Sequence, residues 1–200
     1  AIYSTERKKK YKYSICYNKN NIKEIKKNLT IEIKDAKIKI ISDHFVLETS
    51  LKPVKVISII KSYNNLNLVG YGSSIEIFKQ VGNPRDVVNN FSLKNFSGTH
   101  AIGHTRMATE SAISTDGSHP YSTGEDECLV HNGSLSNHNN LRRTLKKKGI
   151  EIKSQNDTEV AAGYISNGLS NKKSLKETLI DGLKDLDGFY TFISGTKNGL

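Results

Sequence analysis

The alternation of apolar and polar residues in the first half of the chain predicts short strands and one helix. Strands are predicted at residues 11–17, 31–33 and 38–40, because a period of two is typical of half-buried strands. Pro53 is followed by apolar residues at helical spacing and would occupy the first turn of a helix. Residues 70–72 (Gly-Tyr-Gly) should interrupt the chain, and residues 82–84 should form a turn.

The second half is richer in small and polar residues. Strands are expected at residues 101–105, 128–130, 150–152 and 188–193, and helices at residues 141–149, from residue 156 onward, and at 175–183. The strand at 128–130 should end at Asn132, and residues 156–159 resemble a capping box. Hairpins followed by consecutive helices favour an α+β sandwich over a wound parallel sheet. The chain is long enough for one domain, predicted at 1–200 with its motifs in 98–200.

Composition places the chain among ordinary globular proteins. Hydrophobic residues make up 36% and charged residues 25% of the sequence. No apolar run is long enough to span a bilayer, and the first residues do not form a signal peptide. Cys16 and Cys128 are the two cysteines, without a CxxC pair, which argues against a disulfide scaffold. A cytoplasmic protein without a membrane partner is therefore expected.

The net charge of +10 belongs entirely to one part of the chain. Residues 1–97 hold 18 basic and 8 acidic residues, a difference of +10, whereas residues 98–200 hold 12 of each. The densest run, residues 7–12, could bind nucleic acid with Tyr11 and Tyr13 stacking on bases. A solvated hairpin is the favoured alternative, because charge runs are common on protein surfaces. We therefore expect no nucleic-acid partner.

Residues 103–109 contain an arginine at the end of a predicted strand. Arg106 is flanked by small and hydroxyl-bearing residues. Its planar guanidinium can grip a carboxylate through two parallel hydrogen bonds, which lysine cannot copy. A structural ion pair is the alternative for this motif alone.

Residues 131–133 (His-Asn-Gly) follow a predicted buried strand. The side-chain amide of Asn132 and the backbone N–H of Gly133 could point at one spot, as an oxyanion hole requires. Asn-Gly also favours a type I′ hairpin turn. Leu141 and Leu145 predict a helix after it, which weakens the hairpin alternative.

Residues 154–159 offer a carboxylate at a predicted helix start. Asp157 could bind a substrate ammonium group, or it could cap the helix. In combination, Arg106, Asp157 and the Asn-Gly pair describe a site for an α-amino acid whose side chain undergoes acyl transfer. Glutamine fits that description.

Taken together, four short motifs resemble the sequence pattern of one protein family. The patterns H-T-R-x-A-T, His-Pro, H-N-G and D-T-E occur in order at residues 104–109, 119–120, 131–133 and 157–159. Residues 98–163 resemble the conserved block of class II glutamine amidotransferase domains, which are N-terminal nucleophile hydrolases. Residues 98–111 and 131–138 are similar in particular to the glutaminase-like subunit of glutamate-synthase-related enzymes, including methylamine–glutamate N-methyltransferase.

The resemblance implies a fold, a reaction and a partner. The implied fold is a four-layer αββα sandwich, here incomplete at both ends. The implied reaction hydrolyses glutamine to glutamate and ammonia, and delivers the nitrogen to a synthase or transferase subunit, flavin-containing by family analogy. No cofactor site is expected in this chain. No metal site is expected either, because His100 and His104 lie four residues apart without an HExxH motif.

The resemblance also implies roles for individual residues. Arg106 would bind the substrate carboxylate and Asp157 its amino group. Asn132 and Gly133 would form the oxyanion hole. Four further residues would line the pocket: Met107, Ala108, Thr109 and His131. Met107 stands where an aromatic residue is frequent in the family.

The family nucleophile is the cysteine at the mature amino terminus, whereas residue 1 here is alanine. Cys16 and Cys128 lie in predicted apolar strands, where burial makes a thiol inert. Two interpretations follow. A segment carrying the cysteine lies outside this chain, or the protein is a non-catalytic homologue that binds glutamine or a partner. The retained substrate-binding residues favour the first.

Overall fold

The computed structural model of the chain describes residues 1–5, 10–17, 21–106 and 113–200. The elements up to residue 101 are β1 (Ile2–Tyr3), β2 (Tyr11–Tyr17), α1 (Ile22–Glu32), β3 (Lys37–Ile41), β4 (His44–Thr49), α2 (Pro53–Lys61), β5 (Leu66–Gly72), β6 (Ile75–Glu76), α3 (Pro84–Asn90), a 3₁₀ turn (Leu93–Asn95) and β7 (His100–Ala101). The later elements are β8 (Glu127–Leu135), α4 (His138–Lys147), α5 (Asp157–Ser170), α6 (Leu175–Asp185) and β9 (Gly188–Thr196).

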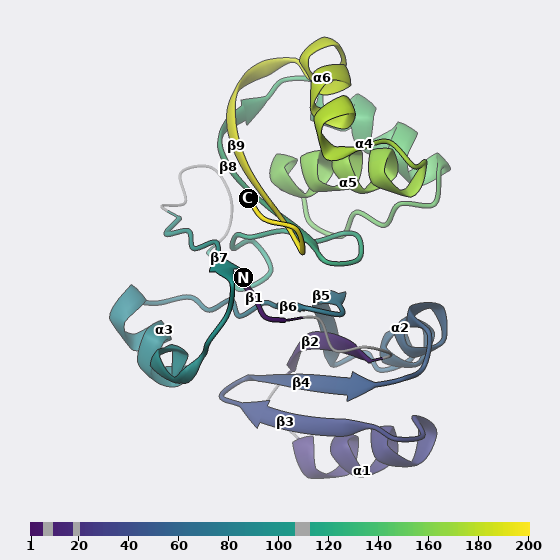
Figure 1. The fold of residues 1–200 in the computed structure, drawn as a ribbon, viewed down its shortest axis with the longest axis vertical. Helices are drawn as coiled ribbons and strands as arrows, with labels where there is room; N and C mark the ends of the chain where they lie inside the picture. Colours follow the sequence, from purple (N-terminus) through teal and green to yellow (C-terminus); the bar gives the residue numbers. More distant parts are fainter. Residues whose placement is uncertain (6–9, 18–20, 107–112) are drawn as a thin grey trace.

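The strands form three antiparallel groups. One sheet has the strand order β3-β4-β2-β5, a smaller one has the order β6-β1-β7, and β8 pairs with β9 along their whole length. In Figure 1 the four-stranded sheet lies in the lower half with α1 and α2, and β8 and β9 lie in the upper half with α4, α5 and α6. The short strands β1, β6 and β7 lie between them.

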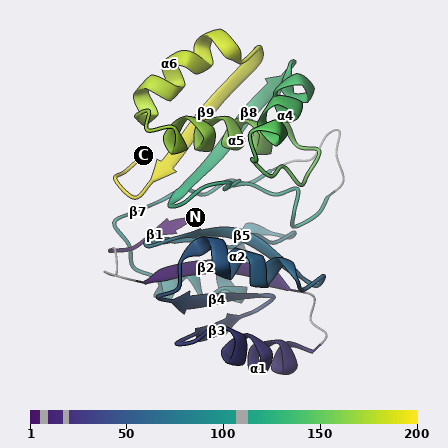
Figure 2. The ribbon, with the colours of Figure 1, turned by 90° about the vertical axis from the view of Figure 1, so that its right-hand side faces the viewer.

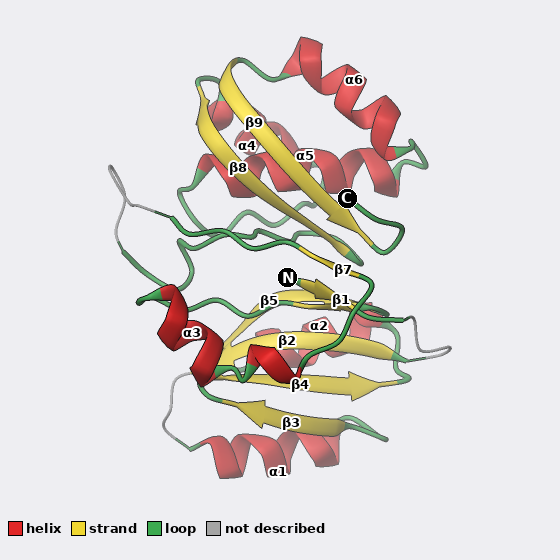
Figure 3. Ribbon diagram, turned by 60° about the vertical axis from the view of Figure 1, so that its left-hand side comes forward, coloured by secondary structure: helices red, strands yellow, loops and turns green. Residues whose placement is uncertain are grey.

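Three apolar layers hold these groups together. Side chains of β2 and β4 pack against α1 and α2, with Tyr13, Leu29 and Phe45 fully buried. A second layer joins β1, β5 and β6 to β8 through Tyr3, Ile75 and their neighbours. A third packs β8 and β9 against α5, as Figures 2 and 3 show from two further sides. The order helix, sheet, sheet, helix is the predicted α+β sandwich, which is confirmed.

Several predicted elements are present within a few residues of the expected bounds, and others are wrong. Of the strand predicted at 101–105, only residue 101 lies in a strand, β7. Residues 31–33 are not a strand, because buried Ile25, Leu29 and Ile33 recur every four residues and place residues 22–32 in α1. Residues 70–72 do not break the chain but end β5. Residues 150–152 form a loop whose Ile152 is buried beside α4 and α5.

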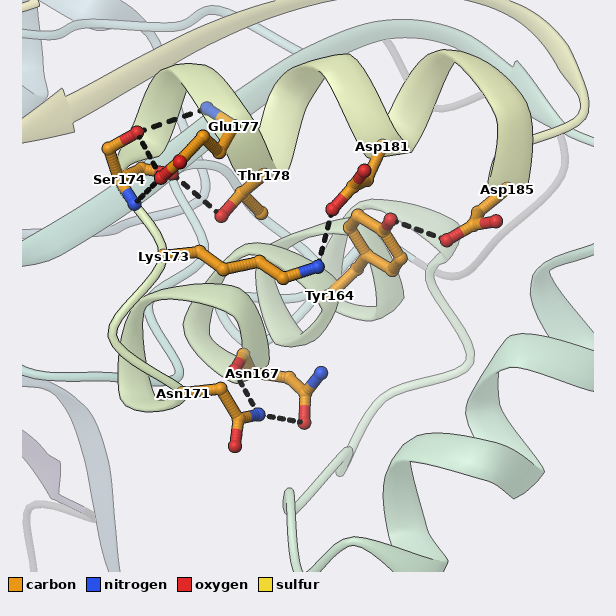
Figure 4. Close-up of polar contacts among 9 residues, drawn as sticks. All are labelled: Tyr164, Asn167, Asn171, Lys173, Ser174, Glu177, Thr178, Asp181 and Asp185. Atoms are coloured by element: carbon orange, nitrogen blue, oxygen red, sulfur yellow. Dashed lines mark hydrogen bonds and ion pairs between the residues drawn. The ribbon is translucent and has the colours of Figure 1, made fainter.

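The capping box predicted at residues 156–159 is also wrong. Asn156 caps α5 alone by accepting a hydrogen bond from the Thr158 N–H at 2.8 Å. Glu159 instead accepts from the backbone N–H groups of Lys153 and Ser154. A complete capping box occurs at α6, where Ser174 and Glu177 each accept a hydrogen bond from the other's backbone N–H, as Figure 4 shows.

Helices α5 and α6 approach each other closely. Tyr164 of α5 donates to Asp185 of α6 at 2.7 Å, and Lys173 pairs with Asp181 at 2.5 Å (Figure 4). Gly168 makes the approach possible, because a Cβ atom there would lie 2.3 Å from the Thr178 hydroxyl oxygen. Thr178 is buried and β-branched, so it cannot swing aside.

We expect Gly168→Ala to destabilise the fold by about 1–3 kcal/mol through overpacking. The matched control is Gly182→Ala in α6, where a Cβ would meet its nearest neighbour at 3.4 Å. That control should be neutral or stabilising by about 0.5–1 kcal/mol, because alanine costs less backbone entropy than glycine in a helix. Equilibrium urea unfolding measures both. Equal stabilities for the two variants would contradict this packing argument.

Glu127 at the start of β8 is a buried carboxyl group. Burial raises its pKa to about 7 from an ordinary value of 4.5, although hydrogen bonds from Ser166 and Thr123 oppose the shift. The folded state therefore keeps a proton that the unfolded chain releases. The stability that this proton contributes is present below about pH 4.5 and is lost as the pH rises to about 7.

We expect Glu127→Gln, which mimics the protonated form, to gain stability relative to the parent as pH rises from 4.5 to 7. The difference should reach roughly 3 kcal/mol above pH 7. Urea unfolding of both proteins between pH 4.5 and 8 measures it. Glu24→Gln on the exposed face of α1 makes the same chemical change at the surface and is the control. A pH-independent difference for Glu127→Gln would rule out the buried-acid explanation.

None of the helices in the described part of the chain is both long and apolar enough to cross a membrane. The predicted basic run lies mostly outside the described residues, since 6–9 are not among them. Lys12 is not on a solvated surface as expected. It is buried and pairs with Glu76 at 2.7 Å.

Candidate functional site

Arg106 lies in the loop that follows β7. One of its terminal N–H groups donates to the carbonyl oxygen of Gly117 at 2.9 Å, which fixes the guanidinium in place. Arg106 lines a cavity of about 860 Å³ together with His104 and His119. Residues 107–112 are outside the described residues, and with them the predicted pocket residues Met107, Ala108 and Thr109.

Three histidines and a threonine form a cluster beside this cavity, in which His119, His131 and Thr158 are buried and His104 is half-buried. The rings of His104 and His119 lie 4.4 Å apart, centroid to centroid. The Thr158 hydroxyl lies 2.8 Å from Nε2 of His119 and 3.0 Å from Nδ1 of His131. His104, His119, His131 and Thr158 each come from a different one of the four sequence motifs. The fold thus joins motifs that are up to 54 positions apart, from 104 to 158.

The alternation of β8 explains how His131 reaches this cluster. Cys128 and Val130 face the neighbouring sheet, while Leu129 faces α5. His131 shares the face of Leu129 and contacts the first turn of α5, where Thr158 is fully buried. Asn156 caps that turn and so presents Asp157 and Thr158 to the strand.

Asp157 is held by β8. One carboxylate oxygen accepts from the Leu135 N–H at 2.9 Å, and the other lies 3.6 Å from Nδ1 of His131. Burial by itself would raise its pKa, but the hydrogen bonds from His131 and the Leu135 N–H outweigh burial and lower the pKa to about 2. An ionised carboxylate therefore stands between α5 and the second half of β8 at neutral pH.

Asn132 and Gly133 lie inside β8, opposite Thr191 and Tyr190 of β9. Both are exposed, and the strand continues to Leu135, so neither the predicted strand end nor the alternative hairpin turn is correct. Gly133 has a φ of 133°, and a Cβ there would lie 2.0 Å from the Phe189 carbonyl oxygen. Only glycine fits this position.

Two histidines of the cluster, His104 and His119, favour the neutral form. Burial lowers the pKa of His104, and lowers that of His119 to about 3, with Arg106 and the neighbouring rings adding to both shifts. Neutral imidazoles can donate or accept hydrogen bonds. The two rings are therefore suited to orienting polar groups beside the Arg106 cation.

The structure brings some predicted residues together and leaves others apart. Asp157 and His131 are in contact, and Asn132 and Gly133 follow His131 directly in β8. Of the described residues, Arg106 lines the 860 Å³ cavity, whereas Asn132, Gly133 and Asp157 do not. The histidine cluster connects them, because His119 lines the cavity with Arg106 and shares the Thr158 hydroxyl with His131, which contacts Asp157.

Lys79 also borders the cavity, and nothing in the sequence singled it out. It is buried, its ammonium lies 4.4 Å from the centre of the Tyr121 ring, and burial lowers its pKa to about 8. Lys79 follows β6, whose Ile75 N–H donates to Asp126 just before β8. Its ammonium donates to the Asp116 carbonyl oxygen at 3.4 Å. His119 and Thr158 belong to the motifs found in the sequence, but the sequence did not show that these two residues contact each other and other motifs.

The two thiols lie in apolar surroundings. Burial raises the pKa of Cys16 to about 11 and also raises that of Cys128, which accepts a hydrogen bond from Tyr3 at 3.3 Å. Within the described ranges, no group of three or more His, Cys, Asp and Glu side chains is arranged to hold a metal ion.

Comparisons with known proteins agree on one family. Residues 104–199 match a family described as a glutamine amidotransferase domain. The glutamine amidotransferase-like protein GlxB of Rhizobium meliloti (strain 1021) is 57% identical over 135 residues, which cover 68% of this chain and 45% of that protein. The chain carries a class II glutamine amidotransferase domain. The histidine cluster and Arg106 therefore lie in an amidotransferase domain.

Two further relatives are more distant. A glutamine–fructose-6-phosphate aminotransferase (isomerizing) of Methanosarcina mazei is 32% identical and is matched over 70% of this chain and 24% of its own length. The solved structure of glutamine phosphoribosylpyrophosphate amidotransferase from B. subtilis superposes on 94% of this chain and 35% of its own, with 19% identity and a TM-score of 0.47. The amidotransferase domain described here thus spans less than half of these relatives.

Proposed function

We propose that the protein carrying this domain hydrolyses glutamine to glutamate and ammonia through a cysteine thioester. One observation carries the proposal. His104, His119, His131 and Thr158, one residue from each of the four motifs, meet in a single cluster. Separate structural uses of the motifs would not require them to meet.

We assign the two charged groups of the substrate to two charged side chains. Arg106, oriented by its bond to Gly117, binds the α-carboxylate, and ionised Asp157 binds the α-ammonium group. His131 lines the pocket together with residues 107–109. This assignment requires Asp157 to accept from the substrate while it keeps its bond to the Leu135 N–H, and a carboxylate has enough lone pairs for both.

The nucleophile is a cysteine outside this chain, because the pKa values of Cys16 and Cys128 are raised and keep both as thiols. Its thiolate attacks the carboxamide carbon, and the oxyanion accepts hydrogen bonds from Asn132 and Gly133. The C–N bond breaks, the leaving nitrogen takes the thiol's proton, and ammonia departs. Water then hydrolyses the γ-glutamyl thioester to glutamate.

The ammonia passes to a synthase or transferase partner. The name of the relative from Methanosarcina mazei joins glutamine to an acceptor, fructose 6-phosphate, which supports nitrogen transfer as the purpose of the domain. Two free thiols without a disulfide support a cytoplasmic location.

The test uses the full-length protein with glutamine and measures glutamate release. A glutamine analogue with an electrophilic carbon at the amide position, followed by peptide mass spectrometry, identifies the nucleophile. Glutamate release together with an adduct on a cysteine outside residues 1–200 is the expected result. Glutamine binding without release would instead identify a non-catalytic glutamine-binding module. An adduct on Cys16 or Cys128 would overturn the assignment of the nucleophile.

A further inference from the structure

The Thr158 hydroxyl lies between two buried imidazole rings and can donate a hydrogen bond to only one of them at a time. It is within hydrogen-bond distance of Nε2 of His119 (2.8 Å) and Nδ1 of His131 (3.0 Å). A hydroxyl group carries one proton and two lone pairs. Among the described residues, the two ring nitrogens are the hydrogen-bond partners of this hydroxyl, so its buried proton goes to one of them and its oxygen accepts from the other. Thr158 is 1% exposed, so water does not compete for these bonds.

Asp157 decides which ring nitrogen donates to the hydroxyl and which accepts from it. Its carboxylate oxygen lies 3.6 Å from Nδ1 of His131, the same nitrogen that faces Thr158. A proton on that nitrogen is attracted by the carboxylate, whereas a bare lone pair would be repelled. Nδ1 of His131 therefore carries the proton and donates to Thr158. The hydroxyl proton of Thr158 then points to Nε2 of His119.

This order fixes the outer nitrogen of His119, whose ring is neutral. His119 must carry its own proton on Nδ1, and His131, when its ring is neutral, presents an unprotonated Nε2. Both atoms are buried and have no hydrogen-bond partner among the residues that the structure describes. The Nδ1 atom of His119 is thus a donor, and the Nε2 atom of a neutral His131 is an acceptor, and each could bond to a further group.

We propose that Thr158 is a positioning residue: it accepts a hydrogen bond from His131, whose Nδ1 proton is held by Asp157, donates to Nε2 of His119, and so makes His119 Nδ1 a hydrogen-bond donor. The use of this ring polarity in orienting the substrate rests on the proposed function. The tautomers themselves do not depend on that function. Thr158 touches neither reacting atoms nor substrate, and acts through the two rings.

The decisive experiment is ¹⁵N NMR of the imidazole rings in the full-length protein at neutral pH. Assignments come from His119→Gln and His131→Gln. We expect Nε2 to be the unprotonated nitrogen of His119 and Nδ1 to carry a proton in His131. In Thr158→Val the His119 ring should lose this fixed form and show a shifted Nε2 resonance, whereas Thr158→Ser should keep the parent spectrum. Thr144→Val, which removes an exposed hydroxyl from α4, is the matched control and should change neither ring.

A second variant keeps the test decisive if Thr158→Val does not fold. Asp157→Asn leaves the threonine in place but removes the charge, so the His119 resonance should move although Asp157 does not touch that ring. A protonated Nε2 on His119 in the parent, or an unchanged His119 in Asp157→Asn, would overturn the proposal.

Activity gives a separate readout. Thr158→Val should lower kcat for glutamine hydrolysis and Thr158→Ser should restore it. If the protein hydrolyses no glutamine, the proposed function fails, and the NMR spectra still decide the tautomers.

Discussion

Replacing Arg106 by lysine in the full-length protein is expected to lower kcat/KM for glutamine hydrolysis by roughly 10- to 100-fold. A hydrogen bond to a charged group contributes about 1.5–3 kcal/mol, and lysine cannot form the paired bonds of a guanidinium. The bond from Arg106 to the Gly117 carbonyl holds the guanidinium plane at the cavity. A lysine ammonium, as a single point, cannot keep that bond and also bind a carboxylate through two parallel bonds.

Steady-state kinetics of glutamate release measure this effect. Loss of substrate binding alone should appear mainly as a higher KM, whereas misplacement of the amide should also lower kcat. Arg143→Lys, on the exposed side of α4, makes the same chemical change away from the cavity and should leave both constants unchanged. Full kcat/KM in Arg106→Lys would refute the role assigned to this arginine.

Replacing Asp126 by alanine is expected to destabilise the protein by about 3–6 kcal/mol, because three backbone N–H groups would lose a buried acceptor that is worth about 1–3 kcal/mol to each. Its carboxylate accepts from the N–H and hydroxyl of Ser73 at 2.9 and 2.7 Å, and from the N–H groups of Ser74 and Ile75 at 2.8 and 3.1 Å. Asp126 directly precedes β8, and residues 73–75 connect β5 to β6. The carboxylate therefore ties the amidotransferase motif region to the first half of the chain.

Urea unfolding of Asp126→Ala and Asp126→Asn tests this. Asparagine tolerates the positive φ of 52° at this position but supplies one acceptor oxygen in place of two. The stability of Asp126→Asn should therefore lie between that of the parent and that of Asp126→Ala. Asp181→Ala removes a partly exposed carboxylate of α6 and should cost much less than either variant, because surface ion pairs contribute little. A loss below 1 kcal/mol in Asp126→Ala would show that the four hydrogen bonds do not hold the two halves together.

The two groups of experiments separate structural from functional roles. Asp126, Gly168 and Glu127 act on the stability of the fold, whereas Arg106 should change the reaction with a small effect on folding, and Thr158→Ser should keep both the fold and the ring tautomers. A variant that loses activity in proportion to its stability belongs to the first group, whichever residue it replaces.

The sequence by itself determined the fold class and the family. Strict alternation over residues 11–17 predicts β2, and Pro53 correctly marks the first turn of α2. These signals are local, because period two and proline geometry act within a few residues. The four motifs identified the family because their order and residue types are specific to it. Short ambiguous runs such as 31–33 failed, since three residues fit a helix as well as a strand.

Only the tertiary structure decided which side chains meet. The sequence gives no distance between His119 and Thr158, or between Asp126 and Ser73, since each pair is separated by tens of residues and joined only when β8 packs against α5 and beside β5. The tertiary structure likewise placed Asn132 and Gly133 inside a strand and buried Lys79 beside the cavity. Packing and desolvation set these contacts and the pKa shifts that accompany them, and both depend on neighbours that are distant along the chain.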